Sequence, residues 1–155
     1  MSVQEGDVAP DFDMPATGQR HARLADLKGK PVVLYFYPKA DTPGCTKEAC
    51  AFQEALPALG KLGIDVIGVS KDKMPAIERF AAKYGLEFPL ASDAETGVAE
   101  KYGTWGEKSM YGRKFMGMER STFLIGKDGR IARIWRKVSV PKHAQEVMEA
   151  AKALP

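Results

Sequence analysis

An uninterrupted apolar stretch near the N-terminal third sets the strongest limit on the fold of this chain. Residues 31–37 read PVVLYFY, with β-branched, aliphatic and aromatic side chains and no alternation of apolar with polar residues. Such a run is typical of a strand that is buried on both faces. Because both faces of that strand need a cover, the run predicts a central strand with a further layer on each side.

The segments that follow supply elements for these layers. Residues 42–60 carry a helix-like pattern, and the apolar run at 64–70 predicts a second buried strand. Residues 74–85 form another helix-like segment, with a proline in its first turn and a glycine at its end, as helix chemistry prefers. A short helix is expected within residues 94–103.

The C-terminal third predicts a hairpin and a last helix. An apolar run at 121–126 and a β-rich run at 130–138 flank the sequence KDG, and Asp-Gly between two such runs is a strong hairpin signal. Residues 141–154 have the pattern of an amphipathic helix. We therefore expect an α/β fold, a central mixed sheet with helices on both faces, as one domain over residues 1–155.

Length and charge exclude several classes of protein. A chain of 155 residues buries enough surface to fold without disulfide staples, so its two cysteines need no structural role. The 23 Lys and Arg against 20 Asp and Glu are too balanced to indicate a nucleic-acid partner. Neither a signal-peptide pattern nor an apolar run long enough to span a membrane is present. We expect a cytoplasmic protein with no nucleic-acid or membrane partner.

Cys45 is the first candidate reactive residue. It lies where the helix after the first buried strand should begin, and reactive sites in open α/β sheets lie beyond the carboxyl ends of the strands. Unpaired N–H groups and the partial positive charge of a helix N-terminus favour a thiolate over a thiol. On position alone, an inert buried cysteine is an equally good interpretation of Cys45.

Cys50, five residues later, changes that balance. In an ideal helix the two Cα atoms would be ~8.7 Å apart, whereas a disulfide tolerates only ~4.4–6.8 Å. The two sulfurs can therefore bond only after the first helical turn unwinds, which the poor helix formers Gly44 and Thr46, and Pro57 further on, would favour. Our hypothesis is that Cys45 reacts while the helix is formed and Cys50 reaches it after unwinding. A zinc site is the competing use of the cysteines, but the chain's two histidines lie far apart and it has no Cys-x-x-Cys.

Several separated motifs resemble one family. PKADTPGC matches the peroxiredoxin pattern Pro-x-x-x-Thr-x-x-Cys at Pro38, Thr42 and Cys45, and ERSTFLI resembles the downstream segment that supplies an arginine, here Arg120. The cysteine spacing, YGTWGEKSMYG and GMERSTFLI are similar to the bacterioferritin comigratory protein, or peroxiredoxin Q, subgroup. The resemblance covers nearly the whole chain and implies a thioredoxin-like fold and a thiol peroxidase.

The resemblance also implies a role for each site residue. Cys45 would be the peroxidatic thiolate and Cys50 the resolving thiol. Arg120 would place a positive charge beside the sulfur and the peroxide, although an exposed arginine at a strand start is the plain alternative. Thr42 would hydrogen-bond the thiolate or peroxide, or cap the helix. Pro38 would shape the loop and exclude water, or simply end the strand.

The implied partners are hydrogen peroxide, alkyl hydroperoxides and a thioredoxin or related dithiol donor, with no cofactor and no metal. Tyr37, Trp105 and Met110 are weaker candidates for the substrate mouth, since aromatic residues and methionine more often belong to the core. We expect a monomer, with a dimer as the alternative. A disulfide reductase would need Cys-x-x-Cys; a redox-sensing or chaperone-like module that uses the same disulfide without rapid turnover is the alternative function.

Overall fold

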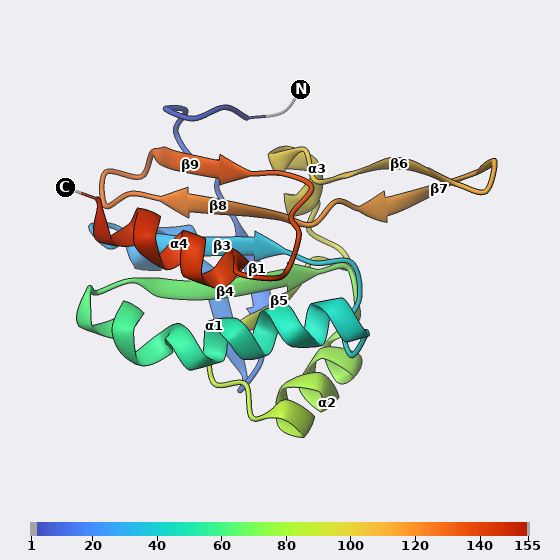
Figure 1. Ribbon diagram of the computed structural model, residues 1–155, viewed down its shortest axis with the longest axis horizontal. Coiled ribbons are helices and arrows are strands. Elements are labelled where there is room, and N and C mark those ends of the chain that lie inside the picture. The colour runs from blue at the N-terminus through green and yellow to red at the C-terminus, as the bar shows by residue number, and fades with distance from the viewer. Residues whose placement is uncertain (1–2, 155) are drawn as a thin grey trace.

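A seven-stranded mixed sheet forms the centre of the computed structural model, which describes residues 3–154 (Figure 1). The three neighbouring strands β3, β4 and β5 are parallel, and the remaining neighbours are antiparallel. In spatial order the strands are β2 (Arg20–Arg23), β1 (Asp13–Ala16), β5 (Leu90–Ser92), β4 (Asp65–Ser70), β3 (Val32–Phe36), β8 (Ser121–Ile125) and β9 (Ile131–Trp135).

Helices cover both faces of this sheet, as the sequence predicted. One face packs against α1 (Pro43–Lys61), α2 (Met74–Tyr84) and α4 (His143–Lys152). The other face packs against α3 (Val98–Tyr102), the 3-10 helix η1 (Leu24–Leu27) and the N-terminal segment. The expectation of a mixed sheet between two layers is confirmed.

Strand β3 lies in the middle of the core because alternate side chains serve opposite faces. Val33 and Tyr35 join the hydrophobic cluster under α1, α2 and α4, whereas Leu34 and Phe36 join the cluster on the other face. Every side chain of β3 is fully buried. The absence of alternation in the sequence thus reflects burial on both sides of the strand.

The sequence did not predict the shortest strands of the sheet. β1, β2 and β5 are three or four residues long, and β1 contains Pro15, so none has enough length for a periodic signal. Two further strands, β6 (Trp105–Met110) and β7 (Arg113–Met118), form a separate antiparallel hairpin. Its turn, Tyr111-Gly112, has positive φ at both residues and would have been a usable signal.

Candidate active site

Cys45 is the third residue of α1, directly beyond the carboxyl end of β3, and its side chain is 1% exposed. The first intrahelical hydrogen bond runs from Thr46 N–H to Thr42 C=O at 2.8 Å. The N–H groups of Gly44 and Cys45 therefore precede the helical ladder and have no intrahelical acceptor. Both remain available, with the helix dipole, to a negative charge at the sulfur.

Arg120 contacts the thiol directly. Its Nη2 lies 3.2 Å from Cys45 Sγ, and the residue precedes β8, whose Ser121 pairs with Phe36 at the end of β3. A Cβ at Gly44 would lie 3.3 Å from Arg120 Nη2, so the glycine leaves room for the guanidinium. The antiparallel pairing of β3 with β8 thus brings Arg120 and Cys45 together across the sequence.

Glu48 completes this group, and sequence reasoning missed it. Its Oε1 accepts a hydrogen bond from Arg120 Nη1 at 2.6 Å, and its side chain is 1% exposed. Glu48 follows Cys45 by one helical turn, so a charged residue on the buried face of the helix was the available signal. Because Glu48 binds one guanidinium nitrogen, it directs the other nitrogen toward the sulfur.

Burial and charge oppose each other in this group. Burial raises the pKa of Glu48 to about 7, although the Arg120 charge and hydrogen bond work in the opposite direction. Burial alone would lower the pKa of Arg120, but the charges of Glu48 and Cys45 outweigh it and raise that pKa. Arg120 consequently keeps its positive charge beside the sulfur, while the Glu48 carboxyl titrates near neutral pH.

The loop before α1 is held at several points. Ala40 N–H donates to Asp72 Oδ2 at 2.7 Å. Asp41, which has a positive φ of 61°, accepts from Tyr84 Oη at 2.7 Å and pairs with Lys83 Nζ at 3.0 Å. These contacts lower the pKa of Asp41, the Tyr84 hydrogen bond most of all. The segment that follows β4 and the C-terminal end of α2 therefore fix the loop from which Cys45 follows.

Thr42 and Pro38 occupy this loop, and neither side chain hydrogen-bonds the sulfur. Thr42 is the N-cap residue of α1, but its hydroxyl makes no capping hydrogen bond and instead donates to Lys39 C=O at 2.8 Å. Pro38 directly follows the fully buried Tyr37 and is exposed. Their parts in peroxide chemistry stay predictions.

Cys50 lies in the same continuous helix as Cys45, and both are free thiols. Cys50 is half-buried against the cluster that contains Cys45. The helix continues through Pro57, whose nitrogen has no hydrogen to donate to the intrahelical ladder.

The three residues considered for the substrate opening lie in different parts of the structure. Tyr37 is buried in the core cluster beneath Cys45, and Trp105 packs against the opposite cluster. Met110 is exposed on the β6–β7 hairpin. The structure therefore does not bring these three side chains together at one opening.

Both histidines have polar partners other than the cysteines. His21 Nδ1 lies 3.1 Å from Asp13, and the buried His143 Nε2 lies 2.8 Å from Thr122 Oγ1. Burial lowers the pKa of His143 to about 4, and the Arg120 charge contributes in the same direction. Within residues 3–154, no group of three or more His, Cys, Asp or Glu side chains is placed to hold a metal ion.

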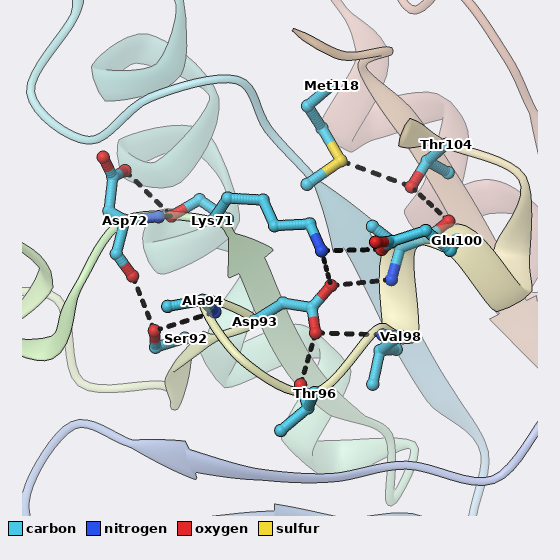
Figure 2. Close-up of polar contacts among 12 residues, drawn as sticks. Lys71, Asp72, Ser92, Asp93, Ala94, Thr96, Val98, Glu100, Thr104 and Met118 are labelled. Carbon is cyan, nitrogen blue, oxygen red and sulfur yellow. Dashed lines mark hydrogen bonds and ion pairs between the residues drawn. The ribbon is translucent and has the colours of Figure 1, made fainter. Parts of the chain in front are cut away.

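A second polar network supports the neighbouring strand ends (Figure 2). The buried Asp93 carboxylate accepts from Val98 N–H and Ala99 N–H at 2.9 and 2.7 Å, and so holds the start of α3. Lys71 Nζ pairs with Asp93 at 3.1 Å and lies 5.4 Å from the Trp105 ring centre. This network anchors the base of the β6–β7 hairpin beside the loop before α1.

Comparison with protein families gives a match over most of the chain. The model of the AhpC/TSA family matches residues 5–134. A putative peroxiredoxin bcp of Coxiella burnetii is 48% identical over 148 residues, which are 96% of this chain and 98% of the relative. Peroxiredoxin Bcp of Bacillus subtilis is 42% identical over 152 residues, covering 98% and 97% of the two chains.

Solved structures agree with these relatives. Peroxiredoxin Q of Xanthomonas campestris superposes with a TM-score of 0.90 at 39% identity, covering 98% of this chain and 97% of that one. Xylella fastidiosa PrxQ gives a TM-score of 0.93 at 38% identity, covering 99% and 98%. Another X. campestris structure, of a bacterioferritin comigratory protein, is described in terms of alkyl peroxide reduction activity. The expected thioredoxin-like peroxiredoxin fold is confirmed.

Proposed function

Because this chain belongs to the AhpC/TSA family, with Bcp and peroxiredoxin Q proteins as its relatives, we propose that it reduces hydrogen peroxide and alkyl hydroperoxides through Cys45. The observation that carries the proposal is the position of Cys45 Sγ, at a helix N-terminus and 3.2 Å from Arg120 Nη2. A buried sulfur beside a fixed cation is suited to attack as a thiolate.

In the first step the Cys45 thiolate attacks one peroxide oxygen and the O–O bond breaks. The sulfur becomes a sulfenic acid, and the other oxygen leaves as water or an alcohol after it takes up a proton. Arg120 and the free N–H groups of the first helical turn stabilise the negative charge that moves from sulfur to the leaving oxygen. Glu48 acts as a positioning residue, because it orients the guanidinium.

In the second step the Cys50 thiolate attacks the sulfenic sulfur of Cys45, the S–O bond breaks, and the leaving hydroxide takes up a proton to become water as the disulfide forms. The two residues lie five positions apart in one continuous helix, so the first turn of α1 has to unwind before this step. We propose that Thr42, at the start of that turn, helps to position the peroxide, and that Pro38 shapes the loop that precedes it.

A thioredoxin or a related dithiol then reduces the disulfide and restores both thiols. We propose that the chain does this as a single cytoplasmic domain and a monomer, with no cofactor. Among residues 3–154, no helix combines the length and apolar character needed to cross a membrane.

Peroxide-dependent NADPH oxidation with thioredoxin and thioredoxin reductase tests the proposal. The wild-type protein should consume many equivalents of peroxide, and Cys45→Ser should consume none. Cys50→Ser should give one fast oxidation in a stopped-flow single turnover and then stall. The matched pair separates attack from resolution, because each variant keeps one of the two thiols.

Two outcomes would contradict the proposal. Equal single-turnover rates for Cys45→Ser and Cys50→Ser would refute the assigned order of the cysteines. A single oxidation of the wild-type protein without further turnover, with the reducing system active on a control disulfide, would favour a redox sensor over a peroxidase.

A further inference from the structure

The β6–β7 hairpin extends outward beyond the end of the sheet at which α1 begins (Figure 1). Its two six-residue strands pair with each other only, from Trp105 opposite Met118 to Met110 opposite Arg113. At ~3.4 Å per residue, each strand reaches about 20 Å. The hairpin is therefore a projecting arm.

The base of this arm is fixed, whereas its outer part is free. Met118 is 2% exposed in the core, and Lys71 lies over Trp105. Lys108 Nζ donates to Met118 C=O and ties the two strands together near the base. The outer half consequently projects from a firmly attached support.

Among residues 3–154, most of the exposed large apolar side chains lie on the outer half of the arm. Tyr111 at the tip is 99% exposed, and Met110, Met116 and Phe115 are 59%, 56% and 43% exposed. Cross-strand register places Met110 and Phe115 on one face of the ribbon and Met116 on the other. The arm therefore presents apolar side chains on both faces and at its end.

Cations are interleaved with these apolar residues. Arg113 and Lys114 are exposed next to the tip, and Lys108 lies further in. Glu107 is the only acidic residue of the arm, and its Oε1 lies 3.7 Å from Lys114 Nζ, so residues 105–118 carry three cations against one anion and Arg113 is the cation next to the tip outside this ion pair. An amphipathic, cationic tip of this kind complements the anionic interface of a lipid bilayer, where tyrosine and basic side chains are favoured.

The shape of the arm distinguishes a bilayer from a protein partner. A groove on a protein would cover one face or one edge of the ribbon, and would leave apolar residues of the other face in water. A lipid interface surrounds a convex tip, so it can bury Met116, Phe115 and Tyr111 together. The basic side chains can then extend toward lipid phosphates.

We propose that the tip of the β6–β7 hairpin, residues Met110 to Met116, docks this protein onto the surface of anionic phospholipid bilayers. The contact is peripheral, without a membrane span, and it replaces the expectation that the protein has no membrane partner. Arg120 follows the base of the arm by two residues, so docking of the tip would hold the end of the sheet that carries Cys45 toward the lipid surface, about one arm length away.

Vesicle co-sedimentation tests this proposal, with phosphatidylcholine vesicles that contain phosphatidylglycerol compared with phosphatidylcholine alone. Tyr111→Asn and Phe115→Thr remove apolar contacts while they respect the turn and the strand, and together they should weaken binding at least tenfold. Arg113→Gln and Lys114→Gln should each weaken it about fivefold and reduce its salt sensitivity. Val8→Thr is the matched control, since Val8 is an apolar residue that is 64% exposed outside the arm.

A second readout is the emission of Tyr111→Trp, which should shift to the blue when anionic vesicles are added. Hydrogen peroxide reduction in solution, measured on the same variants, should stay unchanged, so a failure of docking is distinguishable from a failure of the proposed enzyme function. No binding of the wild-type protein at low salt would overturn the proposal. So would hairpin variants that bind as well as Val8→Thr, or hairpin variants that abolish a dimer seen by light scattering and leave vesicle binding intact.

Discussion

Replacing Glu48 by Gln should remove a pH-dependent loss of stability. Burial raises the pKa of this carboxyl from its usual 4.5 to about 7, so the folded state holds the proton more tightly than the unfolded chain. Stability therefore falls as pH rises from about 4.5 through about 7 and then levels off. At about 1.4 kcal/mol per pKa unit, full ionisation costs the folded state about 3 kcal/mol.

Urea unfolding under reducing conditions, from about pH 5 to about pH 8, measures this loss. Both proteins should carry Cys45→Ser, so that ionisation of this thiol does not contribute. The free energy of unfolding of the protein that keeps Glu48, minus that of the Glu48→Gln variant, should decrease across this range by most of those 3 kcal/mol. Titration of His143 is common to both proteins and cancels to first order.

Glu54→Gln provides the control, because it makes the same carboxyl-to-amide change on the same helix at an exposed side chain. A flat difference for Glu48→Gln, or one that grows with pH, would refute the reasoning. Either result would mean that the ion pair with Arg120 keeps Glu48 ionised over the whole pH range. The attraction to Arg120, rather than burial, would then determine the pKa of the carboxyl.

Three other predictions address the site and its surroundings. Arg120→Met should lower the second-order rate with peroxide by about 10² or more and change stability less; an unchanged stopped-flow rate at neutral pH would contradict a role at the sulfur. As pH falls from about 6.5 to about 4, the protein should lose up to about 3 kcal/mol of stability because His143 is held neutral, and His143→Gln should lack this loss. Equal losses of stability in parallel acid titrations of the two proteins would contradict it. Oxidised protein should lose amide protection over residues 42–50 while the sheet keeps it; hydrogen exchange that finds this turn protected would exclude unwinding.

The main architecture could be predicted because its signals are local. The apolar run that became β3 needs only hydrophobicity and length, and the Asp-Gly turn joins β8 to β9 where expected. The pairing of Arg120 with Cys45 depends on the register of β3 with β8, so no local pattern contains it. The family resemblance supplied that pair instead.

Other features depended on tertiary contacts. Glu48 is an acidic residue, which sequence reasoning places on the surface, and only the position of Arg120 explains why its carboxyl is tolerated in the core. The Thr42 hydroxyl donates to Lys39 C=O and neither caps the helix nor hydrogen-bonds the thiol. Residue spacing does not decide between such competing local partners. Strands as short as β1, β2 and β5 take their geometry from their neighbours.

The link from Asp41 to Lys83 and Tyr84 has a consequence for recognition by a reductant. Asp41 holds the N-terminus of α1 against the C-terminus of α2 while the first turn of α1 is helical. If that turn unwinds on oxidation as proposed, the lysine and the tyrosine hydroxyl lose their partner and become available to another protein. The oxidised form would then display a surface feature that the reduced form keeps occupied. A reductant could recognise the oxidised form by these exposed groups before its own sulfur contacts the disulfide.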